Sequence, residues 1–317
     1  MPLRRWEQLD PDPLPDYLEW LTTRVEVIVV DGSAPELFAR HREAWGRLVT
    51  HVPVAPTLLT ANGKVGGVIT GVHMAPGEKI VIADEDVRYD DVALARIASA
   101  LDEYDLVRPQ NYFSPLSWPA RWDTARTLLN RAFGTDFPGT LAVRRSTFTS
   151  VGGYAGDVVF ENLELLRTAE AAGAHVASCP SLYVRRLPPA ACHFGRQRVR
   201  YAYESLAQPW RMALELSIAP GIAVLGSRHR SGLVAAAIAT ALVAETGRRR
   251  AGGRPRFPAT SSMLAPCWLV ERGTCSWVAL WLRVARGGLR YGDTTIRTAA
   301  NSTRALSSRS PRRSDAA

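Results

Sequence analysis

The most constraining stretch of this sequence is an apolar run, residues 79–83, that changes abruptly into three acidic residues, Asp84, Glu85 and Asp86. An uninterrupted apolar run of this length is typical of a buried parallel strand. In open α/β sheets, ligand sites lie just beyond the carboxyl ends of such strands. We therefore expect Asp84 and Asp86 to lie at the mouth of a cleft.

Asp84 and Asp86 are one residue apart, so their carboxylates can share one hard divalent cation. Such a cation is commonly held by one or two carboxylates together with substrate phosphates. The pair therefore predicts a site for a nucleotide diphosphate with Mn²⁺ or Mg²⁺. The structural alternative is a strand that simply ends in an acidic turn.

Strand and helix patterns alternate through the first two thirds of the chain. Strands are expected at residues 25–30, 51–55, 79–83, 106–109, 140–143, 175–178 and 182–185. Helices are expected at residues 35–49, 66–74, 91–103, 120–133 and 160–172, with a last polar helix from about Phe194. This alternation predicts an α/β fold with a mostly parallel twisted sheet and flanking helices.

The last third of the chain is basic and apolar. The net charge of +9 comes from this part, since basic and acidic residues nearly balance before Ala202. The apolar runs 210–226 and 232–244 are each shorter than the ~20 residues of a bilayer span. They predict a helical hairpin or interfacial pair on an anionic membrane surface, or else two core helices. Segment 268–285 resembles an interfacial helix, and the Ser/Arg-rich end should be disordered.

Charge and cysteine usage narrow the function classes further. The basic residues lie in the apolar tail and no recognised nucleic-acid motif occurs, so nucleic acid is not an expected partner. The four cysteines form no C-x-x-C pair, which favours reduced thiols. The N-terminus turns acidic before any apolar region appears, so we expect no cleavable signal peptide and a cytoplasmic catalytic part.

Several short motifs occur in a characteristic order. Asp31-Gly32-Ser33 follows a strand, Asn62-Gly63-Lys64 precedes the acidic strand, and residues 139–145 and a turn expected at 151–154 follow it. Glu161 then begins a helix, and Gln197-Arg198-Val199-Arg200-Tyr201 comes last. In this order the chain resembles a family 2 glycosyltransferase of the inverting, nucleotide-sugar-dependent kind, in particular its ceramide-glucosyltransferase-like, membrane-attached branch.

The resemblance implies a GT-A-like fold, a nucleotide-diphosphate sugar as donor, a lipid or lipid-linked acceptor, and a divalent cation. It also implies a transmembrane helix and a place at the cell membrane, although both apolar runs are shorter than a span. Nucleotide-sugar binding is expected at Asp31, Gly32, Ser33, Lys64 and Asp84. The acceptor or diphosphate side is expected at Gly139, Gln197, Arg200 and Tyr201, the metal at Asp84 and Asp86, and catalysis at Glu161 and Arg200.

Three departures from the family pattern bear on the site. The family opens with a strand ending in Pro, and here the chain starts at residues 1–3, as though that strand were missing or the start codon were misplaced. Tyr201 replaces the usual Trp. Asn162 replaces the family's Asp, which leaves Glu161 as the candidate base, with Glu164 behind it. Alternatively, Glu161 is an acid that only stabilises its helix start.

The expected organisation is a glycosyltransferase domain over residues 1–208, a membrane-associated helical region over 209–300, and a disordered tail over 301–317. The expected activity is inverting sugar transfer from a nucleotide diphosphate to a lipid or lipid-linked acceptor. The competing hypothesis is a catalytically inactive, membrane-bound relative that serves as a binding or scaffold subunit.

Overall fold

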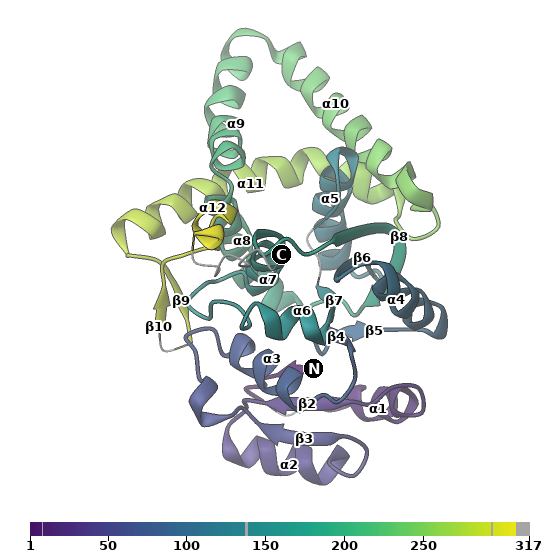
Figure 1. Cartoon of the computed structure of the whole chain (residues 1–317). Coiled ribbons are helices and arrows are strands. Elements are labelled where there is room, and N and C mark those ends of the chain that lie inside the picture. Colours follow the sequence, from purple (N-terminus) through teal and green to yellow (C-terminus); the bar gives the residue numbers. More distant parts are fainter. Residues whose placement is uncertain (8, 137–138, 293, 309–317) are drawn as a thin grey trace, which may run out of the picture. The chain divides into compact units, whose positions relative to one another are not determined.

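The computed structural model describes residues 1–7, 9–136, 139–292 and 294–308 (Figure 1). The chain divides into two compact units. Unit 1 comprises Met1–Arg108, Gly139–Ala177 and Ser302–Ala317, and unit 2 comprises Pro109–Pro138 and Ser178–Asn301. This division differs from the expected boundary at residue 208, because two segments of the expected catalytic domain belong to unit 2.

Unit 1 contains a parallel sheet in the order β1-β2-β3, formed by Pro2–Leu3, Ile28–Asp31 and Thr50–Pro53. Helix α3 (Gly63–Met74) packs on β1 and β2. The α/β expectation with a parallel sheet is thus confirmed. A strand of two residues, β1, occupies the position of the strand that was expected to be missing, since Pro2 and Leu3 pair with Val30 and Asp31.

The acidic strand β4 (Lys79–Ala83) pairs antiparallel with β7 (Thr140–Arg144). Strand β7 also pairs antiparallel with β6 (Leu106–Phe113) at Leu106 and Val107. The expectation of a parallel β4 is therefore wrong for this pairing. An apolar run indicates that a strand is buried, but it does not indicate whether the neighbouring strand runs parallel or antiparallel to it.

The remaining elements of unit 1 are α1 (Leu14–Thr22), α2 (Pro35–Trp45), β5 (Val87–Arg88), α4 (Asp91–Glu103), α6 (Arg145–Ser150), α7 (Glu161–Ala171) and α12 (Thr303–Ser307). Of these, α2, α4 and α7 overlap the helices expected at residues 35–49, 91–103 and 160–172. Gly152 and Gly153 form the expected turn after α6 with φ of 71° and 81°, which favours glycine.

Helix α12 corrects the expectation of disorder beyond residue 301. It packs against α7, and its Leu306 is buried. Residues 309–317 of the expected tail lie outside the described part of the chain. A Ser/Arg-rich composition predicts disorder. Here the burial of Leu306 stabilises a short helix in spite of that composition.

Unit 2 is mainly helical. Its helices are α5 (Trp118–Phe133), α8 (Ala191–Tyr203), α9 (Pro209–Arg228), α10 (Arg230–Arg249) and α11 (Ala259–Ala285), with the hairpin β9 (Leu289–Tyr291) and β10 (Thr294–Ile296). One continuous strand, β8 (Val176–Arg186), replaces the two short strands expected there. It begins in unit 1 and ends in unit 2.

Helix α5 packs against α10 and α11. Their shared core consists of Ala125, Leu128, Ala244, Phe257, Ala265 and Trp268. Arg272 on α11 is only 4% exposed. The expected membrane tail therefore provides part of a protein core, which the sequence pattern could not distinguish from a lipid-facing surface.

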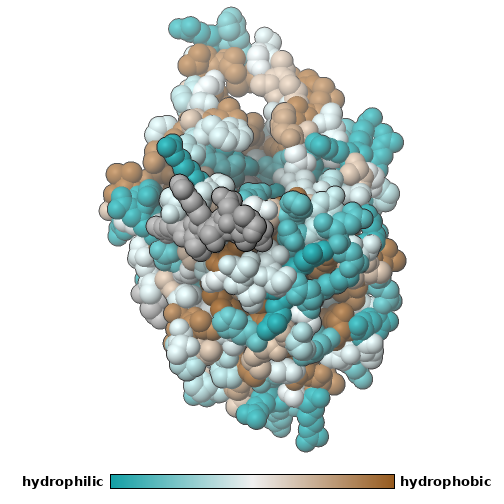
Figure 2. All heavy atoms as spheres, viewed as in Figure 1, coloured by the Kyte–Doolittle hydropathy of each residue, from teal (hydrophilic) through white to brown (hydrophobic). Residues whose placement is uncertain are grey.

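The outer parts of α9 and α10 form an open hairpin (Figure 1). Residues 216–243 are all described, and none of them is buried. Apolar surface lies on both arms of this hairpin, while hydrophilic surface marks its tip (Figure 2). Among the helices in the described ranges, none has the length and apolarity required to span a bilayer.

The crossing of α10 and α5 depends on Gly247. A Cβ atom at this position would lie 1.9 Å from the carbonyl oxygen of Leu128. We expect Gly247→Ala to destabilise the protein by about 3 kcal/mol, because the backbones must separate to admit the methyl group. Gly221→Ala on α9 is the matched control, since no described atom lies within 4 Å of its Cβ.

Urea unfolding of both variants tests this packing. The control should be as stable as the parent or slightly more stable, because Ala is the better helix former. Equal unfolding midpoints for Gly247→Ala and the parent would show that α10 does not pack on α5 through this residue.

Candidate functional site

Three residues that the sequence singled out meet around one ammonium group in unit 1. Lys64 Nζ lies 2.5 Å from Asp84 Oδ1 and 2.7 Å from Glu161 Oε1. Lys64 is in the first turn of α3, Asp84 follows β4, and Glu161 begins α7. Residues far apart in the sequence thus converge on one charged cluster.

The start of α3 arranges this cluster. Asn62 caps the helix by accepting a hydrogen bond from the backbone N–H of Lys64 at 3.3 Å. Its side-chain amide donates to Glu161 Oε2 at 3.3 Å and to the carbonyl oxygen of Val158 at 3.0 Å. Both carboxylate oxygens of Glu161 therefore reach the beginning of α3. Asn62 was expected only as part of a motif, and its role in orienting Glu161 was missed.

Burial sets the electrostatics of the cluster. Burial acts to lower the pKa of Lys64, but the charges of Asp84 and Glu161 outweigh it and raise the pKa above its ordinary value. The lysine is therefore an ammonium ion at any ordinary pH. Tyr154 lies nearby, and burial together with the charge of Glu161 raises the pKa of its hydroxyl. Tyr154 therefore stays neutral.

The carboxylates of the acidic turn fit a divalent cation only in part. Asp84 Oδ1 already faces a positive charge, the ammonium of Lys64. Within the described residues, no three His, Cys, Asp or Glu side chains converge to form a complete metal cage. A cation bound by Asp84 and Asp86 would therefore need further ligands from outside the protein, such as phosphates and water.

The turn after β2 contains Asp31, Gly32 and Ser33. The Asp31 carboxylate is 2% exposed, with Oδ2 at 2.6 Å from His41 Nδ1 and 3.2 Å from His51 Nε2. Burial acts to raise the pKa of Asp31, but hydrogen bonds from Ser33, His41 and His51 lower it overall. The buried Asp31 side chain thus fixes the conformation of the turn. Gly32 and Ser33 are more exposed to solvent than Asp31.

Two further residues of unit 1 complete the expected set. Gly139 is buried just before β7. Glu164, the second candidate base, is 0% exposed, so no solvent reaches it. Glu161 is 7% exposed and is the more accessible of the two acids.

The expected acceptor-side residues belong to unit 2, on α8. Arg200 Nη1 donates to Gln197 Oε1 at 3.4 Å, and its guanidinium lies 5.2 Å from the ring of Tyr291. Two guanidinium groups, those of Arg126 and Arg198, each lie 5.1 Å from the ring centroid of Tyr201. The motif therefore forms a cationic, aromatic cluster within its own unit.

Comparison with known proteins gives structural likeness alone. No protein-family model and no curated protein sequence matches this chain. A mannosyltransferase from Pyrobaculum calidifontis in complex with GDP-Man and Mn²⁺ is 18% identical, with a TM-score of 0.48 over 87% of this chain and 86% of that one.

Two other solved structures are similar to a lesser degree. Glucosyl-3-phosphoglycerate synthase from Mycobacterium tuberculosis is 14% identical, with a TM-score of 0.42 over 62% of this chain and 75% of that one. S. aureus TarS 1–349 in complex with UDP-GlcNAc is 10% identical, with a TM-score of 0.40 over 86% of each chain. At these sequence identities and TM-scores, the similarity concerns the fold and does not extend to the activity.

Proposed function

We propose that this protein is a glycosyltransferase that moves a sugar from a nucleotide diphosphate to an acceptor hydroxyl with inversion. The observation that carries the proposal is the convergence of Lys64, Asp84 and Glu161, from three separate elements, on one point. The motif order of the sequence predicted a role for each of them, and their meeting is an independent result of the fold.

The chemistry requires charge stabilisation and a base. The acceptor oxygen forms a bond to the anomeric carbon while the bond from that carbon to the diphosphate oxygen breaks, with its electron pair leaving on the diphosphate. A cation held by Asp84 and Asp86 would stabilise that negative charge as a Lewis acid. Lys64 can turn from the carboxylates to a phosphate oxygen.

Glu161 is the base in this proposal. The acceptor hydroxyl transfers its proton to Glu161 as the new bond forms. When Lys64 turns to the phosphates, it releases the Glu161 oxygen that it holds before the donor arrives. Gly32 and Ser33 would contact the nucleotide, and Gln197, Arg200 and Tyr201 would serve the acceptor or diphosphate side.

The competing proposal, an inactive binding or scaffold subunit, is favoured by one observation. Lys64 pairs with both the proposed metal carboxylate and the candidate base, so each of these acids already has a cationic partner before any ligand binds. The two proposals differ in a release assay. Purified protein incubated with Mn²⁺ and UDP- or GDP-linked sugars should release the nucleoside diphosphate if it is an enzyme, and none above a buffer blank if it is inactive.

We further propose a lipid or lipid-linked acceptor and attachment to an anionic membrane through α9 and α10. The outward side chains of α10, Val234, Ile238 and Leu242, are 61%, 55% and 61% exposed. Arg228 and Arg230 lie at the tip, where they can meet lipid phosphates. We place the site on the cytoplasmic side, where free thiols such as those of Cys267 and Cys275 are usual.

Vesicle binding tests the membrane surface. The triple variant Val234→Ser, Ile238→Ser and Leu242→Ser should bind anionic vesicles about tenfold more weakly or worse, since each side chain loses apolar area that lipid would cover. Leu59→Ser in unit 1 is the control, because Leu59 is 71% exposed but remote in sequence from the hairpin. Sedimentation of the parent with phosphatidylglycerol vesicles no better than with pure phosphatidylcholine vesicles would contradict the anionic surface.

A further inference from the structure

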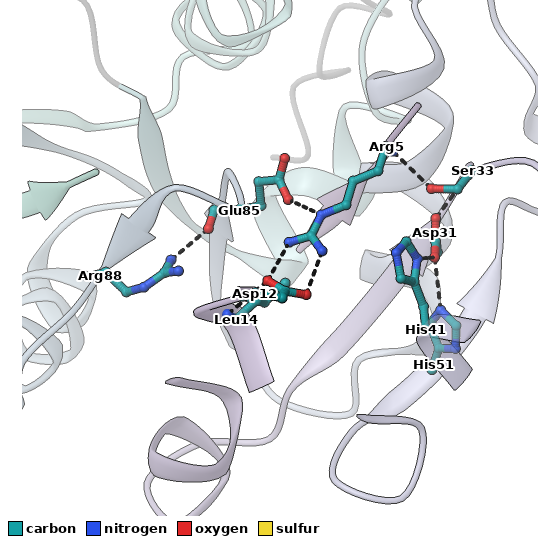
Figure 3. Close-up of polar contacts among 9 residues, drawn as sticks. All are labelled: Arg5, Asp12, Leu14, Asp31, Ser33, His41, His51, Glu85 and Arg88. Carbon is teal, nitrogen blue, oxygen red and sulfur yellow. Dashed lines mark hydrogen bonds and ion pairs between the residues drawn. The ribbon is translucent and has the colours of Figure 1, made fainter. Parts of the chain in front are cut away.

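Arg5 follows β1, two residues after Leu3, and is almost fully buried, with 6% exposure. Its backbone N–H donates to Ser33 Oγ at 2.9 Å. Its guanidinium makes a two-pronged contact with Asp12, at 2.6 and 3.1 Å, and its Nε donates to Glu85 Oε2 at 2.7 Å (Figure 3). One residue thus contacts both turns of the proposed donor site.

The charge of Arg5 is firmly maintained. Burial acts to lower its pKa, but the hydrogen bonds and charges of Asp12 and Glu85 raise it above the ordinary value. Removing the guanidinium would leave two partly buried carboxylates without their cation, which costs far more than the loss of an exposed ion pair. Arg5 is therefore well suited to hold a fixed geometry.

Glu85 is the anchor of the acidic turn. Its carboxylate accepts from Arg5, and its backbone carbonyl accepts from Arg88 Nη1 at 2.6 Å (Figure 3). The preceding residue, Asp84, faces Lys64 instead. The acidic turn is thereby fixed through its middle residue, Glu85.

A continuous chain of hydrogen bonds joins this anchor to the turn after β2. Ser33 accepts from the Arg5 backbone and donates its own N–H to Asp31 Oδ1 at 2.8 Å. Asp31 in turn is fixed by His41 and His51 (Figure 3). Arg5 therefore joins the two turns, through its backbone N–H on one side and its guanidinium on the other.

We propose that Arg5 is a positioning residue of the donor site. It fixes the distance between the Asp31–Ser33 turn and the acidic turn, so that one nucleoside diphosphate can contact both. Glu85 is its anchor and not a ligand of the cation. This inference rests on the proposed function, since it assumes that a nucleoside diphosphate binds there.

The test is direct binding by the full-length protein. Titration calorimetry with UDP and GDP in Mn²⁺, well below the unfolding temperature, should show Arg5→Gln binding the preferred diphosphate at least ~10-fold more weakly. Arg5→Lys should recover part of the loss, because it keeps the charge but not the fork geometry. Glu85→Gln should weaken binding similarly, and the double variant should lose little more than either single variant.

Arg24→Gln is the matched control. It removes a guanidinium paired with a carboxylate, Asp91, in the same unit, but that pair is exposed. It should bind like the parent. Electron paramagnetic resonance of free Mn²⁺ adds a second readout. At a saturating concentration of the diphosphate, the Glu85→Gln variant should still bind Mn²⁺, whereas the Asp86→Asn variant should not.

The outcomes separate the two proposals. If the parent binds a diphosphate and all Arg5 and Glu85 variants bind it equally well, Arg5 stabilises the fold alone and the positioning role is wrong. Additive losses in the double variant would also overturn it. If the parent binds neither UDP nor GDP in Mn²⁺, the proposed function fails, and the role of Arg5 in it fails too.

Discussion

Glu161→Gln is expected to lower the turnover of sugar transfer by about 10²–10⁴-fold, the usual contribution of a positioned general base. Glutamine keeps the size of the side chain and its oxygen can still accept from Lys64, but an amide takes up no proton at neutral pH. The affinity for the nucleoside diphosphate should change little, because Glu161 acts on the acceptor. Steady-state kinetics with calorimetry of the diphosphate separates the two effects.

Glu164→Gln is the control for this substitution. Glu164 is on the same helix, and its side chain is fully buried. It should retain turnover close to that of the parent if it folds, which circular dichroism can check. Turnover by Glu161→Gln equal to that of the parent would place the base elsewhere and would leave Glu161 as an acid that stabilises the start of α7.

Asp86→Asn should lower cation-dependent turnover by about 10³-fold, since loss of Lewis-acid stabilisation removes several kcal/mol from the transition state. Excess chelator should have the same effect on the parent and little further effect on the variant. Asp91→Asn is the control, because Asp91 begins α4 in the same unit with its side chain 69% exposed. Full turnover of Asp86→Asn in excess chelator would exclude a cation at the acidic turn.

Much of the α/β unit could be predicted because its elements carry local signals. Helix α4 has an Asp90 cap and apolar residues on one face, and its bounds match the expected ones. The turn at Gly152 and Gly153 was likewise predicted from residues that tolerate positive φ. Helix caps and glycine turns depend on residues close together in the sequence, so they can be predicted from the sequence alone.

The partners of each element could not be predicted in the same way. The antiparallel pairing of β4 with β7 and the packing of α10 on α5 join segments about 60 and 120 residues apart. An apolar helix face looks the same whether lipid or another helix covers it. For this reason the sequence did not show that Ala244 and Trp268, in the region expected to associate with a membrane, are core residues of the protein.

The sequence named the candidate residues of the site, but not the contacts among them. The motifs identified Lys64, Asp84 and Glu161, but not that one ammonium joins the two acids. Arg5 was missed because nothing in residues 1–5 resembles a motif. Its position just after a strand, two residues after Leu3, is a signal that could have identified it once β1 was recognised.

The most direct test of the central claim is calorimetric binding of UDP and GDP to the parent protein, with Mn²⁺ and with chelator, compared with Asp84→Asn. The account predicts that one diphosphate binds in Mn²⁺, that chelator weakens it by at least ~10-fold, and that Asp84→Asn abolishes the Mn²⁺ effect. Binding that is unaffected by chelator and by Asp84→Asn, or no binding of either diphosphate, would contradict it.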